Sequence, residues 1–170
     1  MDLERSENLD FAQREFVERA LKHLFVESQL DGIKFGFGPG ATFIRFVHYT
    51  SKKEPSELWI NIESKWTVFP SEMNDDFPNT EYEKGDLTEE EEFMLVFQLR
   101  RDKVVDIKLG DTVPNIFIVF QSGLTMFVNG RHDMYECWQA GDGAGYSGEE
   151  WLIVAAPEDD IAIWAPDDFQ

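Results

Sequence analysis

Short apolar segments separated by turn residues constrain this chain more than any other feature. The clearest series runs from Val104 to Trp138, where Ser122-Gly123 marks a tight reversal between two apolar runs. Asn129-Gly130 predicts a second tight reversal, because both residue types tolerate positive φ. This punctuation is typical of an antiparallel meander, whose strands we expect at 105–109, 116–120 and 124–128.

The same pattern occurs 74 residues earlier in the chain. Ile107–Gly110 aligns with Ile33–Gly36, and the block 117–120 aligns with 43–46 without a gap between the blocks. The two copies then differ in loop length, and each contains a tryptophan near its end, Trp66 or Trp138. We interpret the pattern as an internal duplication of αβββ-like units that share one core.

Helical signals precede both sets of predicted strands. Apolar residues at 16, 17, 20, 21 and 24 predict an amphipathic helix over about 11–28, with Asp10 as its N-cap. Before the second set, Thr88 and Glu91 have capping-box spacing. The following segment, 93–99, fits a strand by its alternation and a helix by its cap and its 74-residue counterpart. We prefer the helix.

The remaining segments complete an α+β prediction. We expect further strands at 32–37, 42–49, 57–63, 65–69 and 133–140, and a C-terminal hairpin at 151–156 and 161–165. An acidic, turn-rich connection at 70–87 joins the two halves. The predicted architecture is one domain over 1–170. Two pseudo-repeat units, at about 10–69 and 88–140, form a mostly antiparallel sheet with helices on one face. The C-terminal hairpin, at about 150–166, extends the sheet at its end.

The charge balance restricts the class of partner. Thirty-four acidic and 15 basic residues give a net charge of −19, which argues against binding of nucleic-acid phosphates or an anionic membrane. A basic partner is favoured instead. The single cysteine, Cys137, excludes an intrachain disulfide. The N-terminus lacks a signal-peptide core and no apolar run reaches membrane-spanning length, so we expect a cytoplasmic location.

Catalytic and metal-binding signals are weak. His132 and Cys137 are separated by about 17 Å along the predicted strand, too far for a thiolate–imidazole pair. The acidic loops lack EF-hand spacing, and no Walker, dinucleotide or nucleophile-elbow motif is present. We therefore expect no catalytic residue, no metal and no cofactor. The alternative is a small-ligand-binding or hydrolytic module with a pocket between the halves, near Trp66, His48, His132 and Cys137.

Acidic residues beside aromatic ones form the predicted partner-binding set. Its members are Asp75, Asp76, Asp142, Tyr146, Glu149, Glu150, Asp159, Asp160, Asp167 and Asp168. Carboxylates at these positions suit the Arg and Lys side chains of a basic protein.

The region 87–169 resembles small bacterial proteins of toxin-immunity systems, including those of contact-dependent inhibition. The resemblance rests on the pattern of the second unit and on two short segments, YECW at 135–138 and WAPDDF at 164–169. It implies a non-enzymatic inhibitor that binds and neutralises a basic toxin. A nuclease is the favoured class of toxin, because its polyphosphate substrate requires a basic surface. The oligomeric state is left open.

Overall fold

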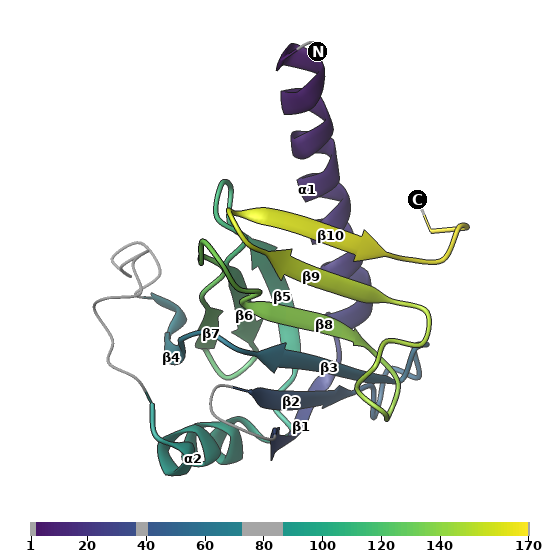
Figure 1. Ribbon diagram of the computed structural model, residues 1–170. Helices are drawn as coiled ribbons and strands as arrows, with labels where there is room; N and C mark the ends of the chain where they lie inside the picture. The colour runs from purple at the N-terminus through teal and green to yellow at the C-terminus, as the bar shows by residue number, and fades with distance from the viewer. Residues whose placement is uncertain (1–2, 37–40, 73–86, 170) are drawn as a thin grey trace.

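The computed structural model describes residues 3–36, 41–72 and 87–169, with the side chains of the first helix from Gln13 onward. Within these ranges the chain forms two helices and ten strands in two antiparallel sheets, which confirms the α+β prediction (Figure 1). The elements in chain order are α1 (Leu3–Phe25), β1 (Gln29–Phe35), β2 (Thr42–Val47), β3 (Glu57–Ile62), β4 (Trp66–Pro70), α2 (Glu89–Leu99), β5 (Val104–Leu109), β6 (Ile116–Phe120), β7 (Leu124–Val128), β8 (Trp138–Asp142), β9 (Leu152–Ala156) and β10 (Asp160–Trp164).

Both helices follow from local signals. The helical preference for 93–99 is confirmed, because Thr88 and Glu91 form the predicted capping box with reciprocal hydrogen bonds of 3.1 Å. In α1 the fully buried residues are spaced as one helical face: Val17, Ala20, Leu21 and Leu24. The predicted start of this helix is wrong, since α1 begins at Leu3 and Asp10 lies inside it.

Two predictions for the segment that follows β7 are wrong. Neither Asn129 nor Gly130 has positive φ, and no hairpin forms there. Gly130 is buried where a Cβ atom would lie 2.0 Å from the Pro114 carbonyl oxygen, so close backbone packing and not turn geometry requires glycine. The strand expected at 133–140 begins at Trp138, and residues 131–136 form an exposed loop.

The strands divide into two sheets instead of the single sheet that the sequence predicts. The six-stranded sheet has the order β1-β2-β3-β8-β9-β10, and the four-stranded sheet has the order β4-β7-β6-β5. The fourth strand of each unit thus pairs in the sheet of the other unit: β4 lies beside β7, and β8 lies beside β3. This exchange ties both units into one structure with a single core cluster.

The 74-residue offset of the sequence also relates the backbones of the two units. β1 and β5 pair with β2 and β6 in the same register, and each pair contains a bulge, at Asp31 and at Val105. Gln29 forms a bridge with Lys103, its own counterpart. Glu27 and Arg101, also counterparts, both have positive φ, 77° and 72°. The units therefore meet with an approximate two-fold relation, while their origin by duplication stays a prediction.

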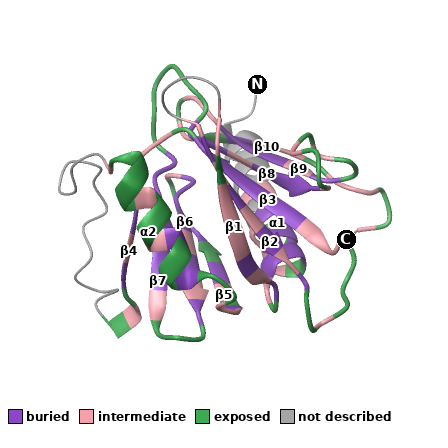
Figure 2. Cartoon of the chain, turned by 90° about the horizontal axis from the view of Figure 1, so that it is seen from below, coloured by how far each residue is buried: buried purple, intermediate pink, exposed green. Residues whose placement is uncertain are grey.

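The helices lie in different places and not on one common face. α1 lies behind the six-stranded sheet and beside β5, where Lys22 forms an ion pair with Asp106 and Glu18 accepts from the Leu109 N–H (Figure 1). α2 lies at the β1 end of the molecule and keeps much of its surface exposed, whereas the central strands are largely buried (Figure 2). α2 therefore offers a large exposed helical surface.

Candidate functional site

The structure separates the predicted partner-binding residues into several groups. Asp75 and Asp76 lie outside the described residues. Asp142 lies in the interior, and Tyr146 is half-buried. The other members, all but one of them exposed, lie at the two ends of the β9–β10 hairpin.

Asp142 organises the loop that follows β8 and is not part of the surface. Its side chain is only 3% exposed, and its Oδ1 atom accepts hydrogen bonds from the backbone N–H groups of Glu149, Glu150 and Trp151 at 2.8 to 3.0 Å. A carboxylate with this many backbone donors fixes a loop conformation. We therefore leave Asp142 out of the candidate surface, although it determines where Glu149 and Glu150 lie.

Tyr146 packs into an aromatic group on the outer side of the six-stranded sheet. Its ring lies 5.0 Å from that of Phe43 and 6.3 Å from that of Trp59, and the Lys34 ammonium lies 5.0 Å from its centroid. These contacts hold the loop against the sheet. Tyr146 thus has an internal role, and its half-buried ring offers little area to a partner.

Four of the predicted acidic residues gather at one end of the hairpin. Trp164 pairs with Leu152 in the β9–β10 ladder, so the residues before β9 and after β10 meet at the same end. The ring of Phe169 lies 4.9 Å from that of Trp151, which brings the two neighbouring acidic pairs together. These pairs are exposed and consist of Glu149 with Glu150 and Asp167 with Asp168.

An exposed tryptophan completes this end of the hairpin. Ile161 and Ile163 pack against the core, so Ala162 and Trp164 project from the opposite side of β10. The Trp164 side chain is 59% exposed. We name this end of the hairpin, which carries Trp164, Glu149, Glu150, Asp167 and Asp168, the tryptophan end. The sequence pointed to the acids of this end but not to Trp164, because alternation alone did not show which side of β10 was free.

Asp159 and Asp160 lie at the other end of the same hairpin, in and beside its turn. The Asp159 carbonyl oxygen accepts from Arg14 of α1 at 2.5 Å, which fixes the turn to the helix. The two acidic groups that looked equivalent in the sequence are therefore separated by the length of the strands.

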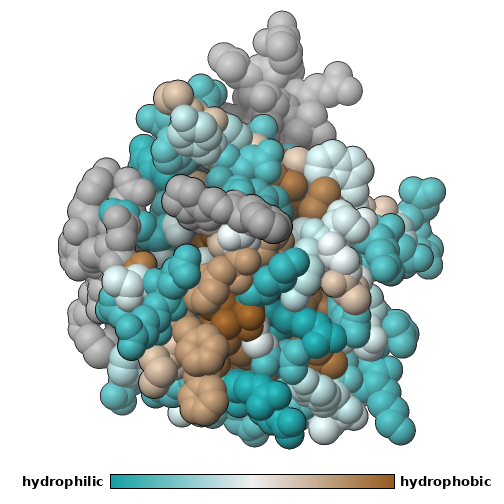
Figure 3. Space-filling view, turned by 60° about the horizontal axis from the view of Figure 1, so that its bottom comes forward, coloured by the Kyte–Doolittle hydropathy of each residue, from teal (hydrophilic) through white to brown (hydrophobic). Residues whose placement is uncertain are grey.

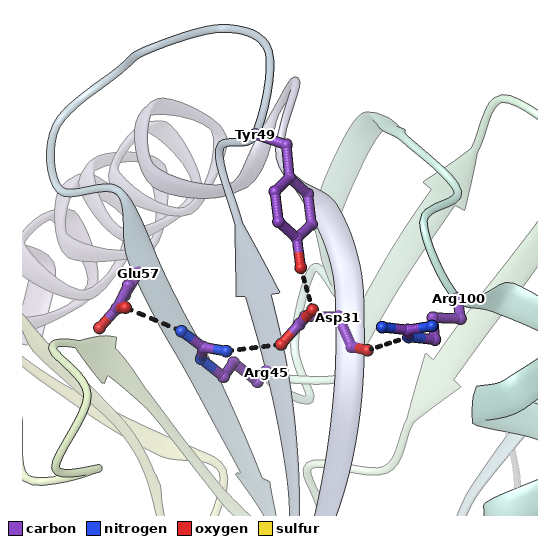
Figure 4. Close-up of polar contacts among 5 residues, drawn as sticks. All are labelled: Asp31, Arg45, Tyr49, Glu57 and Arg100. Carbon is purple, nitrogen blue, oxygen red and sulfur yellow. Dashed lines mark hydrogen bonds and ion pairs between the residues drawn. The ribbon is translucent and has the colours of Figure 1, made fainter.

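A polar network on β1, β2 and β3 was not foreseen (Figure 4). The Arg45 guanidinium donates to Asp31 at 2.6 Å and to Glu57 at 2.8 Å, and the Tyr49 hydroxyl also donates to Asp31. The bulge in β1 places Asp31 where these groups converge. Because this hydrogen bond to Asp31 stabilises the protonated phenol, it raises the pKa of Tyr49.

The same network positions the end of α2. Arg100 donates its Nε–H to the Asp31 carbonyl oxygen at 3.0 Å, and the Arg101 guanidinium lies 5.9 Å from the Tyr49 ring centroid. Arg45 loses solvation here, but its two carboxylate partners outweigh this and raise its pKa. The ion pairs of this network therefore stabilise the fold, and its other contacts orient the exposed side chains of Arg100 and Arg101.

The side chains of the alternative pocket hypothesis have separate local partners. His48 is buried, and its Nε2 atom donates to the Leu24 carbonyl oxygen at 2.7 Å. His132 is exposed, and its Nδ1 atom accepts from two backbone N–H groups of its own loop. Trp66 donates to Glu92, and Cys137 is buried. Both histidines and Trp66 thus have local hydrogen-bond partners, and the pocket hypothesis stays a prediction without a supporting contact.

In the parts of the chain that the structure describes, no group of three or more His, Cys, Asp or Glu side chains could hold a metal ion. Over the same residues, neither helix has the length and apolar character needed to cross a membrane.

No family model matches the chain, and no curated protein or solved structure matches it either. The candidate site therefore rests on its geometry and charge.

Proposed function

We propose that this protein is a non-enzymatic inhibitor that binds and neutralises a basic toxin of the nuclease class in the cytoplasm, and that the tryptophan end is its contact surface. The observation that carries the proposal is Trp164, an exposed aromatic side chain with two acidic pairs at the same end of the sheet. This combination supports recognition of a protein rich in Arg and Lys.

The two components have different physical roles in such a complex. A tryptophan that fills a pocket of the partner can supply most of the binding free energy of a small interface, as aromatic hot-spot residues do. The four carboxylates, added to a net charge of −19, accelerate association with a basic surface and fix its orientation. Binding should therefore weaken as salt screens the charges, mainly through a slower association rate.

A stable support is needed for such an anchor. Trp164 lies on an edge strand, but Gln13 of α1 donates to the Ile161 carbonyl oxygen at 2.8 Å and holds this strand from behind. Asp142 fixes the adjoining loop, as described above. The surface is thus pre-organised, which reduces the entropy lost on binding.

The probe is the product of the gene next to this one, which the proposal requires to be a basic toxin. Its toxicity in cells and its binding by surface plasmon resonance are measured with the wild-type protein and with Trp164→Ala. We expect rescue by the wild type, and for the variant a loss of affinity of at least about tenfold.

Charge reversal locates the surface. Glu149→Lys with Glu150→Lys should slow association, whereas the matched control Glu158→Lys with Asp160→Lys changes the charge equally at the far end of the hairpin. If both double variants slowed association equally, the effect would come from the overall negative charge of the protein and not from the tryptophan end. Failure of soluble wild-type protein to rescue or bind would remove the proposed function itself.

A further inference from the structure

Helix α2 presents an apolar surface that lies far from the tryptophan end. Phe93, Met94 and Phe97 are 48%, 57% and 63% exposed, although Val96 and Leu99 on the opposite side are buried. The two phenylalanine rings are stacked, with centroids 6.4 Å apart. The view from the α2 side shows an apolar area bordered by hydrophilic side chains (Figure 3). We name Phe93, Met94 and Phe97 the α2 face.

This face is held rigidly, because both ends of α2 are anchored. The Glu92 carboxylate accepts from Trp66 Nε1 at 3.0 Å and from Thr42 Oγ1 at 2.9 Å. At the other end Arg100 donates to the Asp31 carbonyl oxygen. The exposed rings are therefore presented by a fixed helix and are not a consequence of a loose segment.

Two of the four acids of α2 have basic counterparts placed symmetrically about Leu95, just after the helix ends, whereas Glu91 and Glu92 are mirrored by the uncharged Leu99 and Gln98. Glu90 and Arg100 are five residues to either side of it, and Phe93 and Phe97 are two residues to either side. Glu89 and Arg101, six residues to either side, extend the pattern. All six residues of these three pairs are exposed. A helix with this order matches itself when a second copy lies antiparallel against it.

We propose that the α2 face is a homodimer interface, in which two α2 helices pack antiparallel across a two-fold axis at the level of Leu95. Phe93 then stacks near Phe97 of the second copy, and Glu90 meets Arg100 of the second copy at each end. Such an isologous interface uses the same patch twice, so each favourable contact occurs twice.

A basic partner protein fits this face less well. Its cations would match Glu89 and Glu90 but would also meet Arg100 and Arg101, which Asp31 and Tyr49 hold at the other end of the helix. A second copy supplies acidic groups to the arginines and arginines to the acidic groups. The dimer also leaves the tryptophan end of both copies free, because β10 and α2 lie at opposite ends of the molecule (Figure 1).

The first experiment measures the mass of the full chain by sedimentation velocity over a range of protein concentrations. We expect a reversible monomer–dimer equilibrium for the wild type. Phe97→Glu should raise the dimer dissociation constant at least about tenfold. Met134→Glu is the matched control, because Met134 is exposed to a similar degree, 70% against 63% for Phe97, but lies in the loop after β7. A wild-type monomer at all concentrations, or equal effects of both variants, would overturn the proposal.

A charge-swap experiment distinguishes contact between copies from contact within one chain. Glu90 and Arg100 of one helix are about 15 Å apart, so they cannot compensate each other within a chain. Glu90→Arg alone and Arg100→Glu alone should each weaken the homodimer, because like charges would then face each other twice. A mixture of the two variants restores opposite charges at both contacts, so we expect a heterodimer. A mixture that stays monomeric while the wild type dimerises would place the interface elsewhere and refute the antiparallel arrangement.

Discussion

Replacement of Asp142 by alanine tests whether one buried carboxylate determines the shape of the proposed contact surface. The variant removes the acceptor of three backbone N–H groups, those of Glu149, Glu150 and Trp151. The first two residues are exposed, so water can replace the lost acceptor there, whereas Trp151 is buried. One unsatisfied buried donor, together with the loss of charge-assisted hydrogen bonds, costs about 3 kcal/mol of unfolding free energy.

Urea denaturation followed by tryptophan fluorescence measures this loss. With an m-value of about 2 kcal/mol/M, the midpoint should fall by about 1.5 M. Asp142→Asn keeps one acceptor oxygen and should lose roughly 1 kcal/mol. Asp111→Ala, at an exposed aspartate between β5 and β6, is the control and should change stability by no more than about 0.5 kcal/mol.

The variant also connects fold and binding. If the Asp142 carboxylate positions Glu149 and Glu150, the folded fraction of Asp142→Ala should bind the basic partner more slowly than the wild type. A midpoint equal to that of the Asp111→Ala control would show that the loop does not depend on Asp142. The reasoning about pre-organisation would then fail as well.

Two further substitutions test the interior. Burial lowers the pKa of His48, so the folded state prefers the neutral imidazole that donates to the Leu24 carbonyl oxygen. The native state then binds fewer protons than the unfolded chain, and stability should decline as the pH falls below about 6.5. In urea titrations at pH 7.5 and 5.5, the wild type should lose more stability than His48→Gln, and parallel losses would contradict the assignment. Gly130→Ala should lower the unfolding free energy by about 1–3 kcal/mol, because its Cβ would clash with the Pro114 carbonyl oxygen, and an unchanged urea midpoint would disprove that close approach.

The tryptophan end and the α2 face give the remaining predictions, and together they separate two functions. Loss of partner binding in Trp164→Ala without a change in mass, and loss of the dimer in Phe97→Glu without a loss of partner binding, would show that the two surfaces act independently. One variant that abolished both properties while folded would show instead that dimerisation and partner binding use a common surface.

The local sequence determined those helices and strands whose formation depends on interactions between residues close together in the chain. The apolar run 116–120, bounded by turn residues, predicted a strand, and the structure shows that both isoleucines and Phe120 face inward, because successive side chains point to opposite faces. The Thr88 and Glu91 pair fixes the start of α2, because a cap satisfies backbone donors only three residues away. The correspondence over 74 residues also predicted which strands are equivalent.

Tertiary structure alone decided how these elements combine. Whether β4 and β8 stay with their own unit or exchange depends on hydrogen bonds to β7 and β3, far away in the chain, and the sequence pattern of a strand does not name its partner. Asp142 and Glu149 look alike as loop acids, yet one is buried beneath backbone donors and the other is exposed. Trp164 became a candidate anchor only when the packing of Ile161 and Ile163 showed which side of β10 is free. The elements could be predicted from the sequence because their signals are local. The binding surface required the assembled fold, because the burial of a residue depends on what packs against it.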